Sequence, residues 1–334
     1  MKKNKKIYVS LAADIIHSGH LNIIKKASQY GDVIIGLMTD KAISEFKDIP
    51  IIDYEQRFNI IKNLKFIKKI VKQEQWDDTY NLKKIKPDYT MHGDDWKKGT
   101  QKKYRDKVIK TMQAWNGKLI EIPYTKKISS TSIHEKIKNL YFNSQSRVSI
   151  LKRLVNSQKL VRVLESHSAL TGLIIENLSI KNKNKSESFH AMWSSSLTDS
   201  TLRGKPDNQS VDYSTRILGL NEIMDVTSKP VIFDGDNGGR LEHIKFLVRS
   251  LERSGVSALV IEDKSGLKKN SLYKNQKGVK QESISKFSKK LKTASLAKNS
   301  KDFYIIARIE SFILGKSLND ALKRAEAYVK AGAD

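Results

Sequence analysis

Acidic residues end several apolar segments in the second half of the chain. Asp234 and Asp236 follow an apolar run and lie two residues apart, so both project the same way from an extended segment. Glu262 ends the next run, and Arg308 and Glu310 end another. In a parallel barrel such strand ends converge at one rim, where carboxylates form a hard oxygen site suited to Mg²⁺ with retained waters. Solvated, charged loops are the alternative, but acidic residues at three strand ends, together with an arginine, favour the metal site.

Two histidines in the first half have the spacing of a phosphate contact. His17 and His20, with Gly19 between them, lie between a predicted strand and a predicted helix. In α/β folds phosphates bind at helix N-termini beyond the carboxyl ends of the strands, where imidazoles can donate to phosphate oxygens. A hydroxyl-rich segment, residues 128–133, follows the last predicted strand of this half and could cradle further phosphate oxygens. A plain helix N-cap needs only one of these hydroxyls, so this segment alone is ambiguous.

Composition limits the classes of protein that remain. The chain has 334 residues, which suggests two domains, and no cysteine, which excludes disulfides, thiolate nucleophiles and Cys-ligated zinc. The net charge of +26 invites a nucleic-acid interpretation, but the lysines are spread over nearly every predicted helix and loop. We therefore expect no nucleic-acid partner and an attraction for small anionic substrates. No run of about 18 apolar residues occurs, so we predict no membrane span and a cytoplasmic protein.

Strand and helix patterns alternate in the first half, which predicts a Rossmann-like, doubly wound parallel sheet. Strands are expected at residues 6–12, 32–38, 66–71, 88–92 and 118–123. Helical spacing occurs at residues 21–27, 54–64 and 104–115. We place this domain at residues 1–142, and a polar linker at residues 143–146.

The second half, residues 147–334, repeats strand and helix in the order of a (β/α)₈ barrel. Strands are expected at residues 160–165, 189–193, 230–233, 258–261 and 303–308, and a polar loop at 181–188. Helices are expected at residues 169–177, 214–227, 241–254, 282–297 and 318–331. We count five strands where a barrel needs eight, so we expect the barrel to be present only through about its fifth strand. A fragment of residues 1–334 would then be inactive as a barrel enzyme and prone to aggregate, and the full-length protein is expected to be a homo-oligomer.

Four motifs in the first half resemble the glycerol-3-phosphate cytidylyltransferase-like branch of the nucleotidyltransferase superfamily. They are His17–His20, Tyr54–Arg57, Gly93–Trp96 and Ile128–Thr131, and the resemblance covers about residues 5–140. It implies that His17 and His20 stabilise charge on the α-phosphate of CTP, with Mg²⁺ as bridging cation and no covalent intermediate.

The same resemblance implies a set of substrate-binding residues. Those for the β- and γ-phosphates are Ser129, Ser130 and Thr131, and the others are Asp14, Lys47, Arg57 and Asp94. The sequence departs from the family pattern at Ala12 and Ala13, and at Tyr124, where the family usually has an arginine. These departures leave open both the acceptor substrate and whether this half turns over.

The segment Glu262–Ser271 carries the most specific motif of the chain. Glu262-Asp263-Lys264, five residues and then Asn270-Ser271 match the EDKx₅NS signature of the phosphoenolpyruvate mutase family, which belongs to the isocitrate lyase superfamily. The resemblance runs from about residue 150 to the end. Other matching positions are Trp193, Ser195, Asp207, Asp234, Asp236, Lys268 and Arg308.

This second resemblance implies that phosphoenolpyruvate is converted to phosphonopyruvate, with a P–O bond broken and a P–C bond made. The implied metal residues are Asp234, Asp236, Glu262 and Asp207. The implied substrate-binding residues are Trp193, Ser195 and Ser271. Arg308 and Asn270 would take the phosphoryl group, and Lys268 and Asn270 would be carried by a loop that closes to exclude water.

The two halves together predict a bifunctional enzyme of phosphonate biosynthesis, a Mg²⁺-dependent mutase fused to a CTP-using nucleotidyltransferase. Because the chain has no cysteine, it lacks the acid that lyases of the superfamily carry in this loop. A phosphonopyruvate hydrolase shares the metal site and remains an alternative, as does another carbon–carbon lyase. A first half that binds nucleotide without turnover is a third possibility, and a basic nucleic-acid-binding protein is the most distant one.

Overall fold

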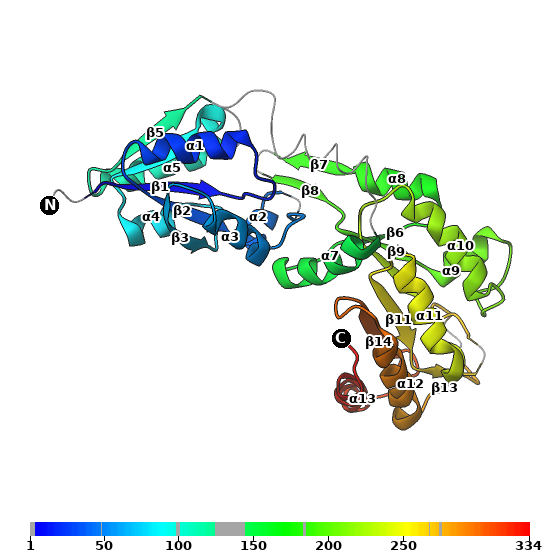
Figure 1. Ribbon diagram of the computed structural model, residues 1–334. Helices are drawn as coiled ribbons and strands as arrows, with labels where there is room; N and C mark the ends of the chain where they lie inside the picture. Colours follow the sequence, from blue (N-terminus) through cyan, green and yellow to red (C-terminus); the bar gives the residue numbers. More distant parts are fainter. Residues whose placement is uncertain are drawn as a thin grey trace. The chain divides into compact units, whose positions relative to one another are not determined.

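The computed structural model describes residues 4–47, 49–97, 101–123, 144–182, 185–266, 268–273 and 276–334. The chain divides into two compact units, each with its own parallel sheet (Figure 1). Unit 1 consists of Met1–Leu140, Asn156–Gln158 and Ile180–Glu187, and unit 2 of Tyr141–Val155, Lys159–Ser179 and Ser188–Asp334.

The sheet of unit 1 has the doubly wound topology that the sequence predicts. Its strands are β1 (Lys6–Leu11), β2 (Asp32–Met38), β3 (Ile67–Gln73), β4 (Tyr89–Gly93) and β5 (Lys118–Ile122). They are parallel in the order β3-β2-β1-β4-β5. The winding therefore reverses between β1 and β4, which is the point where α/β sheets bind ligands.

Helices lie between these strands. They are α1 (Ser18–Ser28), α2 (Asp40–Ser44), α3 (Tyr54–Lys62), α4 (Thr79–Ile85), the 3₁₀ turn η1 (Asp94–Lys97) and α5 (Lys102–Gln113). Alternate residues of β1 enter different hydrophobic clusters, Ile7 and Val9 one and Tyr8 another. Both faces of the sheet are thus buried, as a doubly wound fold requires.

The sheet of unit 2 winds in one direction only. Its strands are β6 (Val163–Glu165), β9 (Ala191–Ser194), β10 (Val231–Asp234), β11 (Ala258–Glu262) and β14 (Tyr304–Arg308). All pair in parallel, and their order in space is their order in the chain. This is the winding of a (β/α) barrel rather than of a doubly wound sheet. The five strands and their order agree with the sequence prediction.

The helices of unit 2 surround this sheet. They are α7 (Ser144–Ser157), α8 (Ala169–Asn177), α9 (Ser196–Leu202), α10 (Tyr213–Met224), α11 (Leu241–Arg253), α12 (Ile284–Ala297) and α13 (Leu318–Lys330). Along β11, Leu259 and Ile261 join the cluster packed with α11 and α12, whereas Ala258 and Val260 join a second cluster with Leu151 of α7. Both faces of β11 are buried, which explains its uninterrupted apolar sequence.

Some local structure differs from the sequence prediction. The predicted polar loop at 181–188 contains most of two paired strands, β7 (Ser179–Asn182) and β8 (Lys185–Ser188). The strands β12 (Lys264–Ser265) and β13 (Lys280–Gln281) were likewise unexpected and pair antiparallel. These short strands carry no apolar alternation that a sequence pattern could reveal. Among the described helices, none is long and apolar enough to cross a membrane.

Candidate active sites

The β1–α1 loop places the two predicted histidines side by side at the start of α1. His17 is the N-cap, and its Nδ1 accepts a hydrogen bond from the backbone N–H of Gly19 at 3.1 Å. Nδ1 of His20 faces the backbone N–H of His17 at 3.3 Å, and the ring centroids are 4.0 Å apart. Because each Nδ1 is an acceptor, each neutral ring carries its proton on Nε2. That N–H is the group that can donate to a phosphate oxygen.

Burial keeps both rings of this histidine pair neutral. Burial lowers the pKa of His20 to about 4, with smaller contributions from the charges of His17 and Lys47. Burial also lowers the pKa of His17. Positive charge at this site therefore comes from Lys47 and from the N-terminus of α1 rather than from imidazolium. Lys47 is exposed, with its ammonium 5.5 Å from the ring centroid of Trp76.

Asp94 lies in η1, directly after β4 and thus beside the end of β1. A side-chain contact with β5 fixes this turn, because the indole N–H of Trp96 donates to Glu121 Oε1 at 2.9 Å. Arg105 binds both oxygens of Glu121, at 2.8 and 3.0 Å. The Arg105 guanidinium, first of several causes, lowers the pKa of Glu121 to about 2. The ion pair therefore fixes the backbone that presents Asp94.

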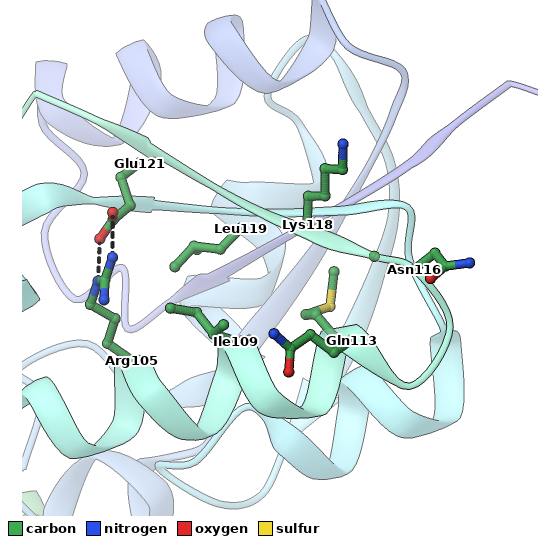
Figure 2. Close-up of a pocket in the computed structure, with 9 residues that line it drawn as sticks. Arg105, Ile109, Gln113, Asn116, Lys118, Leu119 and Glu121 are labelled. Carbon is green, nitrogen blue, oxygen red and sulfur yellow. Dashed lines mark hydrogen bonds and ion pairs between the residues drawn. The ribbon is translucent and has the colours of Figure 1, made fainter.

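A pocket of about 710 Å³ lies on the other side of this ion pair, between α5 and the edge strand β5 (Figure 2). Its lining residues are Arg105, Ile109, Met112, Gln113, Asn116, Gly117, Lys118, Leu119 and Glu121. The charges of Arg105 and Glu121 are already matched to each other there. The histidine pair lies at the β1–β4 switch point, and this pocket does not, so the geometry favours the histidines as the site of unit 1.

Arg57, predicted to bind substrate, is instead a buried structural residue. Its side chain has no exposed surface. The acceptors of its guanidinium are the carbonyl oxygens of Ile52, Ala12 and Met38 and the carboxylate of Asp40. With its donors used inside the protein, Arg57 cannot reach a ligand, so the prediction of direct substrate contact is wrong. Arg57 is part of the motif that the sequence identified, but in the structure its role is to tie α3 to the ends of β1 and β2.

Asp14, also predicted to bind substrate, holds a loop. Its two carboxylate oxygens accept the backbone N–H groups of Ile51 and Ile52, at 3.0 and 2.9 Å. The side chain is 6% exposed. The other predicted phosphate contacts, Ser129, Ser130 and Thr131, lie outside the described residues.

In unit 2, the turn after β10 presents two carboxylates at the carboxyl edge of the sheet. Asp234 ends the strand, and its Oδ1 accepts the backbone N–H of Asp236 at 3.0 Å. A Cβ at Gly235 would lie 2.4 Å from Leu259 Cδ1 and 2.9 Å from the Val260 carbonyl oxygen, so only glycine fits. Asp236 itself has φ +51°, in the left-handed region. The turn thus requires glycine at 235, and it holds Asp236 in a conformation that most L-residues avoid.

Lys268 brings the signature loop onto these carboxylates. Its ammonium donates to Asp207 Oδ1 at 2.9 Å and also contacts Asp236 and Ser196. Asn270 Nδ2 donates to Asp207 Oδ2 at 2.9 Å. Lys268 and Asn270 are 6% and 8% exposed, so this contact is made out of solvent. Four of the predicted site residues, Lys268, Asn270, Asp207 and Asp236, therefore meet in the folded chain.

Burial and neighbouring charge compete within this cluster. Burial alone would raise the pKa of Asp234, but Lys268 and Arg216 lower it below its ordinary value. For Asp236 burial dominates and raises the pKa. Burial acts to lower the pKa of Lys268, yet the Asp234 and Asp236 carboxylates raise it overall, so the ammonium stays charged.

A second set of charges surrounds Arg308 at the end of β14. Its Nη2 lies 2.7 Å from Glu262 Oε2 and 2.9 Å from Ser271 Oγ, and its Nε lies 2.6 Å from Glu310 Oε1. Arg308 remains 34% exposed along its side chain. Glu262 is 1% exposed, and burial raises its pKa to about 7, against the opposing charges of Arg308 and Lys264. Arg308 is thus fixed in direction but accessible to an anion.

The other predicted substrate residues of unit 2 lie at the end of β9. Trp193 is within the strand and packs into the cluster on its inner face. Ser195 is the N-cap of α9, and its Oγ accepts the backbone N–H of Thr198 at 3.4 Å. The neighbouring Ser196, which the sequence did not single out, is the serine that reaches Asp234, at 3.0 Å.

Further residues of this site were missed from the sequence. Arg216 of α10 is 2% exposed and donates to Asp199 Oδ2 at 2.8 Å and to the Asp234 carbonyl at 2.6 Å. It shares the apolar face of α10 with Leu220 and Ile223, and a charged residue on such a face is the signal that could have identified it. Lys264, 3.0 Å from Glu310, was visible in the motif but given no role.

The carboxylates of this edge fit a hard cation, although they do not form a closed cage. Among the described residues no group of three or more His, Asp or Glu side chains is arranged to hold a metal ion directly. Mg²⁺ keeps several waters and needs only one or two carboxylates. Within the described part of the chain, Glu262 Oε1 is buried without a hydrogen-bond partner, and such an oxygen suits a hydrated cation. The Lys268 ammonium supplies positive charge that balances the carboxylates of Asp207 and Asp236.

Family models match both units. Residues 151–334, more than half of the chain, match phosphoenolpyruvate phosphomutase. The chain belongs to the phosphoenolpyruvate phosphomutase family. Residues 12–136 match the cytidylyltransferase-like family, so this phosphomutase family member also carries a cytidylyltransferase-like domain.

Individual relatives agree with this assignment. The phosphoenolpyruvate phosphomutase of Tetrahymena pyriformis is 34% identical over 196 residues, 58% of this chain and 62% of that protein. A phosphonopyruvate hydrolase of Variovorax is 31% identical over 182 residues, 54% of this chain and 62% of that protein. The chain thus spans about 62% of the length of these relatives. An ethanolamine-phosphate cytidylyltransferase of Dictyostelium discoideum is 27% identical over 134 residues, 40% of this chain and 36% of that protein.

A solved structure supports the barrel winding of unit 2. The phosphoenolpyruvate phosphomutase of Streptomyces platensis superimposes with a TM-score of 0.51 at 31% identity, covering 56% of this chain and 62% of that one. The predictions of family and fold class are therefore confirmed for both halves of the sequence.

Replacing Arg57 by methionine should destabilise unit 1 by about 3–5 kcal/mol, since one carboxylate and three carbonyl oxygens lose a buried donor. Urea unfolding followed by tryptophan fluorescence measures this, because Trp76, Trp96 and Trp115 belong to unit 1. Lys62→Met, an exposed change at the end of the same helix, is the control and should stay within about 0.5 kcal/mol. Equal effects of the two changes would contradict the structural role of Arg57.

His20 should remain neutral down to about pH 4, because its folded pKa lies below the ordinary value of 6.5. Between those pH values the unfolded chain binds a proton that the folded chain does not, so stability falls as pH falls through this window. The imidazole proton shifts in NMR spectra, assigned with His20→Gln, should not titrate between pH 8 and 5. A titration midpoint near pH 6.5 would show that the His20 ring is solvated, and would contradict the neutral pair.

Proposed function

We propose that unit 2 carries out Mg²⁺-dependent interconversion of phosphoenolpyruvate and phosphonopyruvate, and that unit 1 transfers a nucleotidyl group, CMP, to a phosphonate or phosphate acceptor. The observation that carries the first part is the contact of Lys268 with Asp207 and Asp236. It joins the most specific loop of the sequence to the carboxylates of the strand ends. A first unit that acts later on the phosphonate product would make the fusion a route from P–C bond formation to an activated phosphonate.

The residues of unit 2 divide between the two ends of the substrate. Mg²⁺ held near Asp234 and Asp236 would stabilise the enolate oxygen and carboxylate of pyruvate. Arg308 and Asn270 contact the phosphoryl group, which in a loose transition state resembles metaphosphate and needs positioned positive charge and donors. Among the described residues, Nη1 of Arg308 has no hydrogen-bond partner, so it is available to a phosphoryl oxygen.

Exclusion of water decides whether the phosphoryl group is moved or hydrolysed. Lys268 and Asn270 are both buried when the loop lies on the carboxylates, which supports transfer within a closed site. A phosphonopyruvate hydrolase is the second candidate, because a relative with that name is 31% identical to this chain. The same metal and phosphoryl contacts serve both reactions, so the products decide between them.

In unit 1 the chemistry is charge stabilisation by neutral donors. The Nε2–H groups of His17 and His20, together with the N-terminus of α1, would bind the α-phosphate as negative charge develops during attack. No covalent step is needed, because positioning and electrostatics carry phosphoryl-type transfers. The cytidylyltransferase-like match over residues 12–136 supports CTP as the nucleotide.

The full-length gene product, given phosphonopyruvate and Mg²⁺, should form phosphoenolpyruvate. The reaction can be monitored by ³¹P NMR. Arg308→Lys should lower kcat/KM by about 100-fold or more, because lysine lacks the rigid fork that holds Glu262, Glu310 and a phosphoryl oxygen together. Lys292→Met, an exposed change on α12, is the control and should leave the rate unchanged. Formation of phosphate and pyruvate instead would establish the hydrolase, and full activity in EDTA would refute the metal site.

For unit 1, CTP and a panel of phosphonates and alcohol phosphates should give pyrophosphate, measured with a coupled phosphate assay. His20→Ala should lower kcat by about 100-fold or more, since one preorganised donor to the developing charge is lost. Lys26→Ala, an exposed change in the last turn of the same helix, should have little effect. CTP binding without any pyrophosphate release would favour a nucleotide-binding module over a transferase.

A further inference from the structure

Asp263 is the central residue of the Glu262-Asp263-Lys264 motif, yet its carboxylate binds groups outside the acid cluster of Asp207, Asp234 and Asp236. The side chain has no exposed surface. It accepts four hydrogen bonds, from Glu310 N at 2.9 Å, Gln281 Nε2 at 2.8 Å, Arg324 Nη1 at 3.2 Å and Tyr328 Oη at 2.8 Å. A buried carboxylate with four donors is held rigidly, and through it the segments that bear those donors are held together.

The first of these segments is the base of the signature loop. Gln281 belongs to β13, which pairs with Lys264 of β12, so Asp263 contacts both strands at the point where the loop leaves and rejoins the unit. Its main chain adds to this, because Glu282 N donates to the Asp263 carbonyl at 2.7 Å. The two ends of the loop that delivers Lys268 are thus fixed to one residue.

The second segment follows β14. The N–H of Asp263 donates to the carbonyl of Arg308 at 3.1 Å, and its carboxylate accepts the N–H of Glu310. The Glu310 side chain in turn contacts Arg308 at 2.6 Å and Lys264 at 3.0 Å, and accepts from Ser271 at 2.8 Å. The direction of the Arg308 guanidinium therefore depends on Glu310, and the Glu310 backbone depends on Asp263.

We propose that Asp263 is a positioning residue for the phosphoryl end of the unit 2 site. It acts through Glu310 on Arg308, and through β13 on the loop residue Ser271, which contacts both Glu310 and Arg308. The catalytic effect of Asp263 rests on the proposed function of unit 2. Its structural effect on the backbone of Arg308 and Glu310 is independent of that function. The carboxylates Asp234 and Asp236 of the metal end lie on a different turn, and their side-chain partners are Ser196, Arg216 and Lys268.

The test compares Asp263→Asn with Tyr328→Phe in the full-length gene product. Asparagine keeps the shape but turns one oxygen into a donor that faces donors. Phenylalanine removes the Tyr328 hydroxyl with its bonds to Asp263 and Arg324, and leaves the bond from Arg324 to Asp263. We expect Asp263→Asn to raise hydrogen exchange at least tenfold in a peptide covering residues 308–311, with no change over residues 231–236. Tyr328→Phe should lower Tm while leaving exchange at 308–311 within threefold of the unmodified protein.

The kinetic readout separates the two ends of the substrate. Oxalate resembles the pyruvate enolate and has no phosphoryl group, so its inhibition constant reports the metal end alone. Asp263→Asn should lower kcat/KM for phosphonopyruvate at least 30-fold and change the inhibition constant of oxalate less than threefold. Equal losses in both quantities, or exchange raised uniformly over unit 2, would reduce Asp263 to a structural residue and overturn the proposal.

If the unmodified protein turns over no phosphonopyruvate, the proposed function fails, and the exchange at residues 308–311 still decides the positioning role. If Asp263→Asn does not fold, Gln281→Leu replaces it, because leucine has a similar size and removes the hydrogen bonds from Gln281 to Asp263 and Ser311. That variant should lower kcat/KM at least threefold with unchanged oxalate inhibition, and an unchanged kcat/KM would overturn the proposal.

Discussion

The site of unit 2 depends on one ammonium group buried among carboxylates. Lys268 contacts Asp207 and Asp236, and the charges of Asp234 and Asp236 are what keep it protonated out of solvent. Each partner alone would be costly to bury, because an unpaired buried charge destabilises a fold by several kcal/mol. Together they let a loop of polar residues pack against the end of an apolar sheet. The position of Asn270 beside Asp207 follows from that packing.

The two candidate sites offer positive charge or hydrogen-bond donors to an anion in different ways. Unit 2 gathers paired charges, with Arg308 held between Glu262 and Glu310 and still accessible. Unit 1 uses neutral imidazoles, whose tautomers are set by the backbone N–H groups at the start of a helix. The first arrangement suits a group transferred as an anion in a closed site, and the second suits charge that develops only in the transition state.

Several buried polar residues of the motifs have supporting roles. Arg57, Asp14 and Asp263 occupy or adjoin motifs that resemble known families, and each binds backbone groups rather than an open site. A motif records which residues a site requires, including those that only shape it. For this reason a match in sequence does not separate residues that contact a ligand from residues that hold the contact in place.

The sequence alone was enough to predict the main parallel strands of both units, the family of each, and the acidic strand ends of unit 2, because apolar periodicity and motif spacing are local properties. It did not reveal Arg216, whose partners Asp199 and Asp234 come from other segments of the chain. It also assigned Arg57 to substrate, since burial is not visible in a motif. Only the tertiary structure decided that Ser196, rather than Ser195, reaches Asp234, because that choice depends on how α9 begins after β9.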